Sequence, residues 1–124
     1  MIPAKIIVAY QRELTAYRNA RVQNDELECT LRLSRAHVLS QGSVSLHLRT
    51  HWLMLGHATM KMDPKEFVGQ LVRLFVTVPG HCIGKVPRGN TGWSTVGLTQ
   101  QLPVPHDLQE ILDCDSTDYN HSRR

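Results

Sequence analysis

Two histidines four residues apart, His47 and His51, carry the clearest chemical signal in this sequence. Positions i and i+4 lie on one face of an α-helix, one turn apart, so the two imidazoles would point the same way. His37 lies near the end of the preceding apolar segment and joins them if residues 41–43 form a tight turn. Imidazole is a common nitrogen ligand of Zn, Cu and Ni. The pattern therefore predicts a transition-metal site at His37, His47 and His51.

The alternative interpretation of these histidines is structural. Buried histidines often fill polar gaps between helices by donating to a backbone carbonyl or to a hydroxyl such as that of Thr50 or Ser40. Under the metal interpretation, Met54, His57, water or a loop group would complete the site. His57 follows His51 by six residues and points away from the metal face, so it is expected to face solvent or to fill a packing position.

Other candidate sites carry weaker signals. Residues 89–92 (GNTG) fit either an anion-binding nest or an ordinary tight turn, and no Lys-Ser/Thr pair follows to mark a nucleotide loop. His81 and Cys82 are expected in an extended segment, where adjacent side chains point in opposite directions and cannot activate each other. No Ser-His-Asp or paired-carboxylate pattern is present, and spacing places no general base near the histidines. The sequence therefore names no catalytic residue and weighs against an enzyme.

Helical periodicity and caps predict four helices before residue 79. The first covers residues 6–22, Asp25 caps a second that runs to about residue 40, and a third covers about residues 44–62. Asp63 and Pro64 begin a fourth helix, which should end before Pro79. The residues expected to face the core are Ile6, Ala9, Tyr10, Leu14, Tyr17, Val22, Leu27, Leu31, Ala36, Leu39, Trp52, Phe67, Leu71, Leu74 and Phe75.

The expected fold class is all-α, with two antiparallel helix hairpins in one domain spanning residues 1–112. Cys29, Leu33 and Ala36 resemble, in their small–large–small spacing, the second helix of a tetratricopeptide repeat (TPR), which predicts TPR-like packing. Glycines and prolines rule out long helices in residues 79–106, so this segment is expected to form an extended arm over the bundle. A short C-terminal helix from about residue 108 to 112 and a disordered tail over 113–124 complete the expectation.

Composition limits the possible classes of protein. The chain has 124 residues, 41% of them hydrophobic, and a net charge of +3 that comes from scattered arginines, so nucleic-acid binding is not expected. Its three cysteines, Cys29, Cys82 and Cys114, form no C-x-x-C pair, which argues against a disulfide framework. The apolar start is too short for a signal sequence, and no apolar run is long enough to cross a membrane. A soluble, cytoplasmic protein is expected.

Four ordered motifs resemble those of a small bacterial family of unknown function. They are residues 35–41 (RAHVLSQ), 47–55 (HLRTHWLML), 86–92 (VPRGNTG) and 103–108 (PVPHDL), and residues 68–71 (VGQL) resemble a further family segment. The resemblance covers about residues 10–112 and implies a small helical domain with a proline-rich tail. It also implies genes that lie beside heavy-metal resistance functions, an association that favours a metal-related role. Ser34 stands where the family has an acidic residue, which would weaken the site if that carboxylate were a ligand.

Two functions are therefore considered. The first is a metal-binding accessory protein, acting as a buffer, sensor or chaperone through His37, His47 and His51. The second is a protein-interaction module in which a TPR-like groove or the proline-rich arm holds a partner and the histidines are structural. The partner and the oligomeric state are left open.

Overall fold

The computed structural model describes residues 2–121, with side chains described for residues 2–113, and its regular secondary structure over that range is entirely helical. The helices are α1 (Ala4–Val22), α2 (Glu26–Ser40), α3 (Val44–Met60), α4 (Pro64–Cys82) and α5 (His106–His121). The predicted all-α class is confirmed. No helix within the described range combines the length and the apolar composition needed to cross a bilayer.

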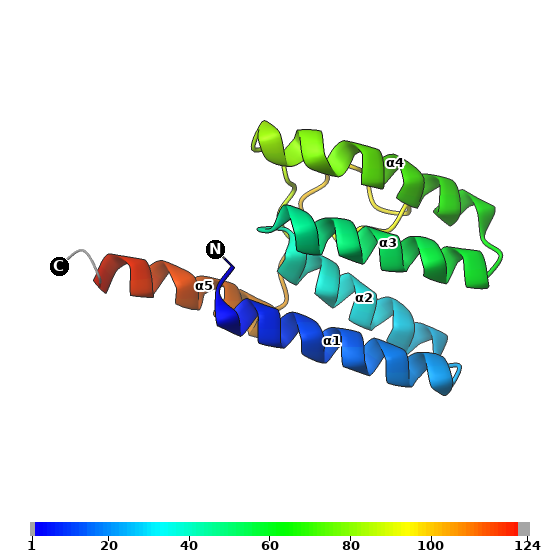
Figure 1. Ribbon diagram of the computed structural model, residues 1–124, viewed down its shortest axis with the longest axis horizontal. Helices are drawn as coiled ribbons and strands as arrows, with labels where there is room; N and C mark the ends of the chain where they lie inside the picture. The colour runs from blue at the N-terminus through cyan, green and yellow to red at the C-terminus, as the bar shows by residue number, and fades with distance from the viewer. Residues whose placement is uncertain (1, 122–124) are drawn as a thin grey trace.

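Three-residue turns join the first four helices, and each turn ends in a side-chain cap. Asp25, Ser43 and Asp63 accept hydrogen bonds from the backbone N–H groups of Glu28, Leu46 and Glu66, which satisfies one of the free donors at the start of α2, α3 and α4. Short turns place consecutive helices side by side and antiparallel (Figure 1). That this packing is of the TPR type stays a prediction.

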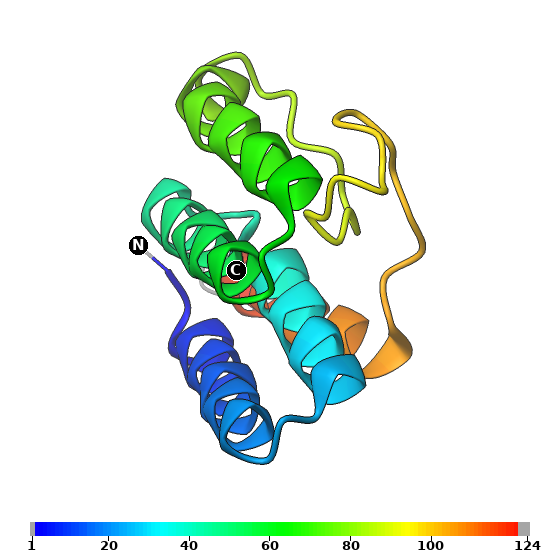
Figure 2. The same ribbon diagram turned by 90° about the vertical axis from the view of Figure 1, so that its right-hand side faces the viewer.

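The helices contact one another in chain order. α2 packs against α1 and α3, and α4 packs against α3 at the far side of the bundle (Figure 2). α5 contacts α1 and α2 near its start and then projects away from the other helices (Figure 1). Arg35 of α2 fixes this arrangement, because its guanidinium pairs with Glu13 of α1 and with Asp107 of α5.

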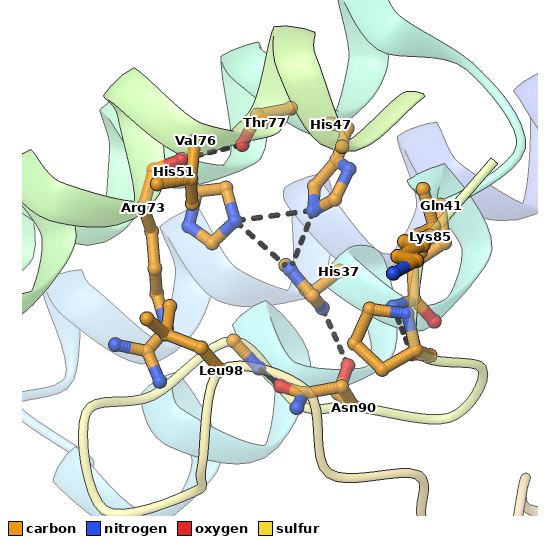
Figure 3. Close-up of a pocket in the computed structure, with 14 residues that line it drawn as sticks. His37, Gln41, His47, His51, Arg73, Val76, Thr77, Lys85, Asn90 and Leu98 are labelled. Atoms are coloured by element: carbon orange, nitrogen blue, oxygen red, sulfur yellow. Dashed lines mark hydrogen bonds between the residues drawn. The ribbon is translucent and has the colours of Figure 1, made fainter. Parts of the chain in front are cut away.

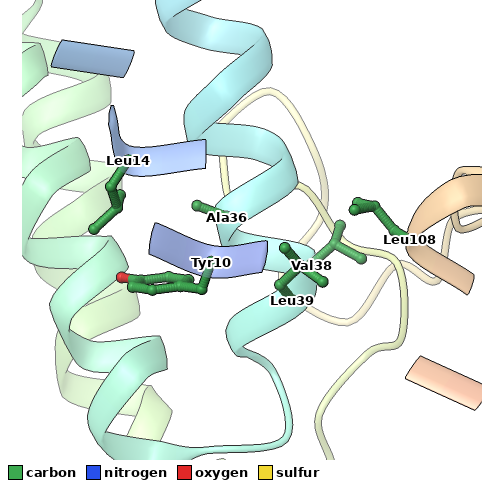
Figure 4. Packing of buried hydrophobic residues seen from close by; sticks show 6 residues of the cluster. All are labelled: Tyr10, Leu14, Ala36, Val38, Leu39 and Leu108. Atoms are coloured by element: carbon green, nitrogen blue, oxygen red, sulfur yellow. The ribbon is translucent and has the colours of Figure 1, made fainter. Parts of the chain in front are cut away.

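The apolar core lies between α1, α2, α3 and the start of α5. Figure 4 shows its larger cluster, which consists of Tyr10, Leu14, Ala36, Val38, Leu39 and Leu108. A second cluster lies toward the other end of α1 and α2 and consists of Tyr17, Ala20, Cys29, Leu33 and Met54. The small–large–small positions predicted in α2 are therefore buried.

Two tyrosines of α1 connect the core to α3 with their hydroxyl groups. The Tyr10 hydroxyl lies 2.9 Å from Oγ1 of Thr50, which itself donates to the Leu46 carbonyl, so the tyrosine is the donor. The Tyr17 hydroxyl lies 3.2 Å from Nδ1 of His57. Burial raises the pKa of both tyrosines, so they remain neutral hydrogen-bonding groups.

Helix α4 has the reverse of the expected amphipathic arrangement. The face that it turns toward the rest of the molecule is polar and buries Glu66, Gln70, Arg73 and Thr77. Its outer face is apolar, and Phe75, which the sequence placed in the core, is 80% exposed. The reason lies in residues 83–105, which form no regular helix or strand and run between α2 and α4 (Figure 2). Their backbone carbonyls lack a regular hydrogen-bond ladder and need side-chain donors.

Several other sequence predictions are corrected by the fold. Helix α4 does not end before Pro79 but continues to Cys82, since proline removes only one N–H donor and the next turn is closed by the Ile83 and Lys85 amides. Trp52 is 66% exposed, because it lies about a quarter turn away from the buried face of α3. Exposed apolar residues also include Val22, Leu27 and Leu31, which lie beyond the surfaces that α1 and α2 bury.

The last helix is longer than predicted. α5 runs from His106 to His121, whereas the sequence placed its end at about residue 112. The disordered tail predicted for residues 113–124 overlaps the end of α5, and residues 122–124 lie outside the described range.

The contrast between two leucines of α2 gives a direct test of the core. Leu33 is fully buried and Leu27 is 86% exposed. Leu33→Ala should lower the free energy of unfolding by ~2–5 kcal/mol, because it leaves a cavity between α1, α2 and α3. Leu27→Ala, the same change on the same helix, should alter it by less than ~0.5 kcal/mol. Urea denaturation followed by circular dichroism measures both, and equal losses would contradict this core.

Candidate metal centre

The three histidines predicted from the sequence meet at one point between α2 and α3 (Figure 3). The Nε2 atom of His37 lies 2.9 Å from Nε2 of His47 and 3.1 Å from Nε2 of His51. The Nε2 atoms of His47 and His51 are 3.1 Å apart. The four-residue spacing on α3 brings His47 and His51 together, and the turn at residues 41–43 brings His37 back against them. All three side chains are buried.

The outer nitrogens of two of these rings have partners that fix the position of the proton. His37 Nδ1 lies 2.5 Å from the Asn90 carbonyl oxygen, which can only accept. His51 Nδ1 lies 2.7 Å from Oε1 of Gln70. The Gln70 amide nitrogen donates to Glu66 Oε1 and to the Gly92 carbonyl, so the oxygen of the amide faces His51 and accepts. Both histidines therefore carry their proton on Nδ1.

This tautomer leaves two lone pairs aimed at each other. Burial, together with the neighbouring imidazoles, lowers the pKa of His37 well below its ordinary value, and burial lowers that of His51 to about 4. At neutral pH both rings are uncharged, so neither Nε2 atom carries a hydrogen. Two acceptors 3.1 Å apart with no hydrogen between them repel each other. An electrophile at the centre would remove that repulsion.

His47 connects the three-histidine cluster to α4. Burial lowers its pKa to about 3, and its Nδ1 lies 2.9 Å from Nε2 of His81. His81 can either donate or accept in this contact, so His47 is free to present a proton or a lone pair at its Nε2. The sequence analysis missed this contact because it placed His81 in an extended segment. The signal was present, however, since Glu66, Gln70, Arg73, Thr77 and His81 form a polar stripe at helical spacing across Pro79.

The segment 89–92 supports the three-histidine cluster, and its role as an anion-binding nest stays a prediction. The Asn90 carbonyl accepts from His37, and the Asn90 side chain holds the loop closed through the Gly97 and Gln100 carbonyls. Gly92 has a positive φ of 86°, and a Cβ atom placed there would lie only 2.6 Å from the His37 ring. The loop therefore needs glycine at this position so that its backbone can approach the imidazole.

Other residues considered from the sequence lie elsewhere. Met54 belongs to the apolar core. His57 is buried, with its Nε2 2.9 Å from the Glu26 carboxylate and its Nδ1 3.2 Å from the Tyr17 hydroxyl. Of the two positions expected for His57, facing solvent or filling a packing position, the structure shows the second. Ser34 accepts a hydrogen bond from Nε1 of Trp93 and donates one to the Thr30 carbonyl.

A small pocket opens beside the three imidazoles. Its cavity volume is about 60 Å³, which is room for a few water-sized groups and too little for a typical organic substrate. Residues of α2, α3 and α4 and of the segment 85–98 form its walls. Fourteen described residues line it, and none of them is acidic or sulfur-containing: His37, Gln41, His47, His51, Arg73, Val76, Thr77, Gly80, Lys85, Val86, Pro87, Asn90, Gly92 and Leu98.

Gly92→Ala tests whether the loop holds the cluster together. The new methyl group would push the His37 ring and would also strain a backbone of positive φ, so the free energy of unfolding should fall by at least ~1 kcal/mol. Gly97→Ala is the matched control, because a Cβ atom there meets Gln100 at an ordinary 3.5 Å. Chemical denaturation gives the stabilities, and nitrogen-15 NMR of the imidazoles should show that Gly92→Ala alone disturbs the His37 Nδ1–H hydrogen bond. An undisturbed His37 signal in that variant would contradict the close packing.

Comparison with known proteins identifies the family but not its activity. No curated protein and no solved structure shows significant similarity to the chain. A family model described as "Protein of unknown function (DUF3703)" matches residues 4–112, which is most of the sequence and contains all three histidines of the cluster together with the supporting loop. The chain therefore belongs to the DUF3703 family of proteins of unknown function.

Proposed function

We propose that this protein binds one divalent transition-metal ion through the Nε2 atoms of His37, His47 and His51. The observation that carries the proposal is the 3.1 Å approach of the His37 and His51 Nε2 atoms, with both protons held on the opposite nitrogens. Without an ion, His47 can offer at most one hydrogen to these two buried acceptors, and an acceptor left without a donor costs free energy. A metal ion can accept the electron pairs of three converging imidazole nitrogens at once.

The distances support a metal of this size. A tetrahedral zinc ion with bonds of ~2.0–2.1 Å holds its nitrogens about 3.3 Å apart. The Nε2 atoms here are separated by 2.9 to 3.1 Å, so small movements of the rings would admit the ion. His47 would then donate from Nδ1 to His81, just as His37 donates to Asn90 and His51 to Gln70. Each ligand would have an outer hydrogen-bond partner, as metal-binding histidines generally do.

The donor set narrows the choice of metal. Three neutral nitrogens with no sulfur nearby suit Zn(II), Ni(II) and Cu(II), whereas Cu(I) prefers thiolate or thioether ligands. Met54, the thioether that would have favoured Cu(I), packs in the core. The two free cysteines among the described side chains, Cys29 and Cys82, are not members of the cluster.

The surroundings favour metal handling over hydrolysis. A hydrolytic site needs a general base at the open position, and none of the described residues that line the pocket is acidic. Glu66 is not among the residues that line the pocket; it is hydrogen bonded to Ser94 and to Gln70, which in turn contacts His51. We therefore favour a buffer, sensor or chaperone for the metal, which the gene association implied by the family resemblance also favours.

A protein-interaction role is the second candidate, and the apolar outer face of α4 favours it. Val68, Val72, Phe75 and Val76 are exposed there at helical spacing. Between Glu66 and Lys85 the only Lys, Arg, Asp or Glu residue is Arg73, which is buried. A face without charge can meet its own copy without like-charge repulsion, so we propose that its occupant is a second copy of this chain.

Replacing two ligands tests the metal proposal. Wild-type protein prepared without a histidine tag should bind one equivalent of Zn(II), and His47→Gln/His51→Gln should bind none, because one imidazole cannot hold the ion alone. Isothermal titration calorimetry with Zn(II), Ni(II) and Cu(II) measures the stoichiometry. With free metal about a hundredfold above the dissociation constant, the wild type should gain ~2.7 kcal/mol of stability that a chelator removes.

The control for this experiment is His106→Gln, which removes a histidine whose side chain is almost fully exposed. It should leave one metal site and the same stabilisation. Unchanged metal stoichiometry in the double variant, or wild-type protein that binds none of the three metals, would rule the proposal out.

The second candidate is tested through the oligomeric state. Sedimentation velocity should show a dimer of the wild-type chain, and Phe75→Lys should shift it to a monomer, because the lysine places a charge in the apolar contact. Leu27→Lys adds the same charge at an exposed leucine of α2 and should leave the dimer intact. A monomeric wild type at all accessible concentrations would remove this candidate.

A further inference from the structure

The pocket beside the three histidines has an unusual charge balance. Its lining includes Arg73 and Lys85, and none of the described residues around it offers a carboxylate. Figure 3 shows the two cationic residues on opposite sides of the imidazoles. Three neutral ligands would leave a bound divalent ion with its full charge, and the two cations add to it. The positive charge would then have no counterion within the pocket.

Arg73 is the more informative of these two residues. Its side chain belongs to the buried face of α4, and the residue is only 7% exposed. No acidic group lies within ion-pair distance of it among the residues whose side chains are described. It donates hydrogen bonds to the carbonyls of Trp93 and Val96, and both come from the same terminal nitrogen. A guanidinium has five N–H donors, so others remain for a ligand in the pocket that it lines.

We infer that the metal bound here takes a small monovalent anion as a further ligand, held in the pocket between Arg73 and Lys85. This inference rests on the proposed metal site. The anion would coordinate the metal at the position that the three imidazoles leave open, displacing water, and its charge would offset part of the positive charge of the ion and the guanidinium. Val76, Val86 and Leu98 form apolar parts of the wall, which lowers the local dielectric and strengthens the attraction.

The size of the pocket defines the ligand class. With a cavity volume of about 60 Å³, it admits an anion of a few heavy atoms, such as azide, cyanide or formate. The ligand class is thus a small inorganic anion or a one-carbon acid.

Cobalt(II) in place of the native metal makes the test visible, because its absorption spectrum reports coordination number and ligand type. Full-length protein is loaded with Co(II), the stoichiometry is measured, and the sample is titrated with sodium azide at constant ionic strength. The wild type should bind cobalt and change its spectrum saturably with azide. Lys85→Gln and Arg73→Gln should each weaken azide binding, the latter by about tenfold, because a charge-assisted contact to the anion is lost.

Two further variants control for charge and folding. Lys65→Gln removes an exposed charge outside the pocket and should leave azide affinity as in the wild type. Arg73→Lys keeps the charge, and it should bind azide more tightly than Arg73→Gln. Because Arg73 also holds the carbonyls of residues 93 and 96, cobalt stoichiometry and circular dichroism are recorded for every variant, and Lys85→Gln carries the test if Arg73→Gln does not fold.

The outcomes separate this inference from the proposed function. Cobalt binding with no spectral response to saturating azide would overturn the anion site and leave the metal site standing. If Lys85→Gln and folded Arg73→Gln both bind azide as tightly as the wild type, these two side chains do not hold the anion, and that assignment is overturned. Failure to bind any of cobalt, zinc, nickel and copper would overturn the proposed function itself, and this inference with it.

Discussion

The structure depends on how three imidazoles are buried in contact with one another. A histidine in a protein interior is easily accommodated when each ring nitrogen has a partner of the right kind. Here the outer nitrogens of His37 and His51 are satisfied by Asn90 and Gln70, and this commits their inner nitrogens to be acceptors. The outer nitrogens each have a hydrogen-bond partner, whereas the two inner acceptors can share at most one hydrogen, from Nε2 of His47. Such a combination holds the rings in place for a ligand and costs stability in its absence.

The need to support those rings explains why α4 is polar on its inner face. The loop over residues 83–105 passes close to His37 and presents carbonyl groups to the interior, and these require donors. Gln70 donates to Gly92, Arg73 to Trp93 and Val96, and Gln41 to Pro87. Because these donors point inward, the apolar side chains of α4 are left on the outside. One constraint therefore accounts for both the supported histidines and the exposed apolar face.

The sequence predicted those parts of the structure that follow from local rules. Helix starts were found from Asp25 and Asp63 because a capping carboxylate acts on its own next turn. His47 and His51 were placed together by helical spacing, and His37 by the shortness of one turn. Phe75 and Trp52 were misplaced because apolar character indicates a face without telling which neighbour it meets. His81 was missed because the rule that proline ends helices was applied where the helix continues one more turn.

The positions of the histidines along the chain have a consequence for folding. The three rings lie within 14 residues of one another, on two adjacent helices, so closing this part of the site costs little chain entropy. The Asn90 carbonyl that orients His37 is 53 residues away from it in sequence, and its contact requires a much larger loop to close. An ion captured by the α2–α3 hairpin would therefore precede the docking of the loop, and the loop would close over it. Metal binding would then be coupled to folding, and the docking of residues 83–105 would be the last step of both.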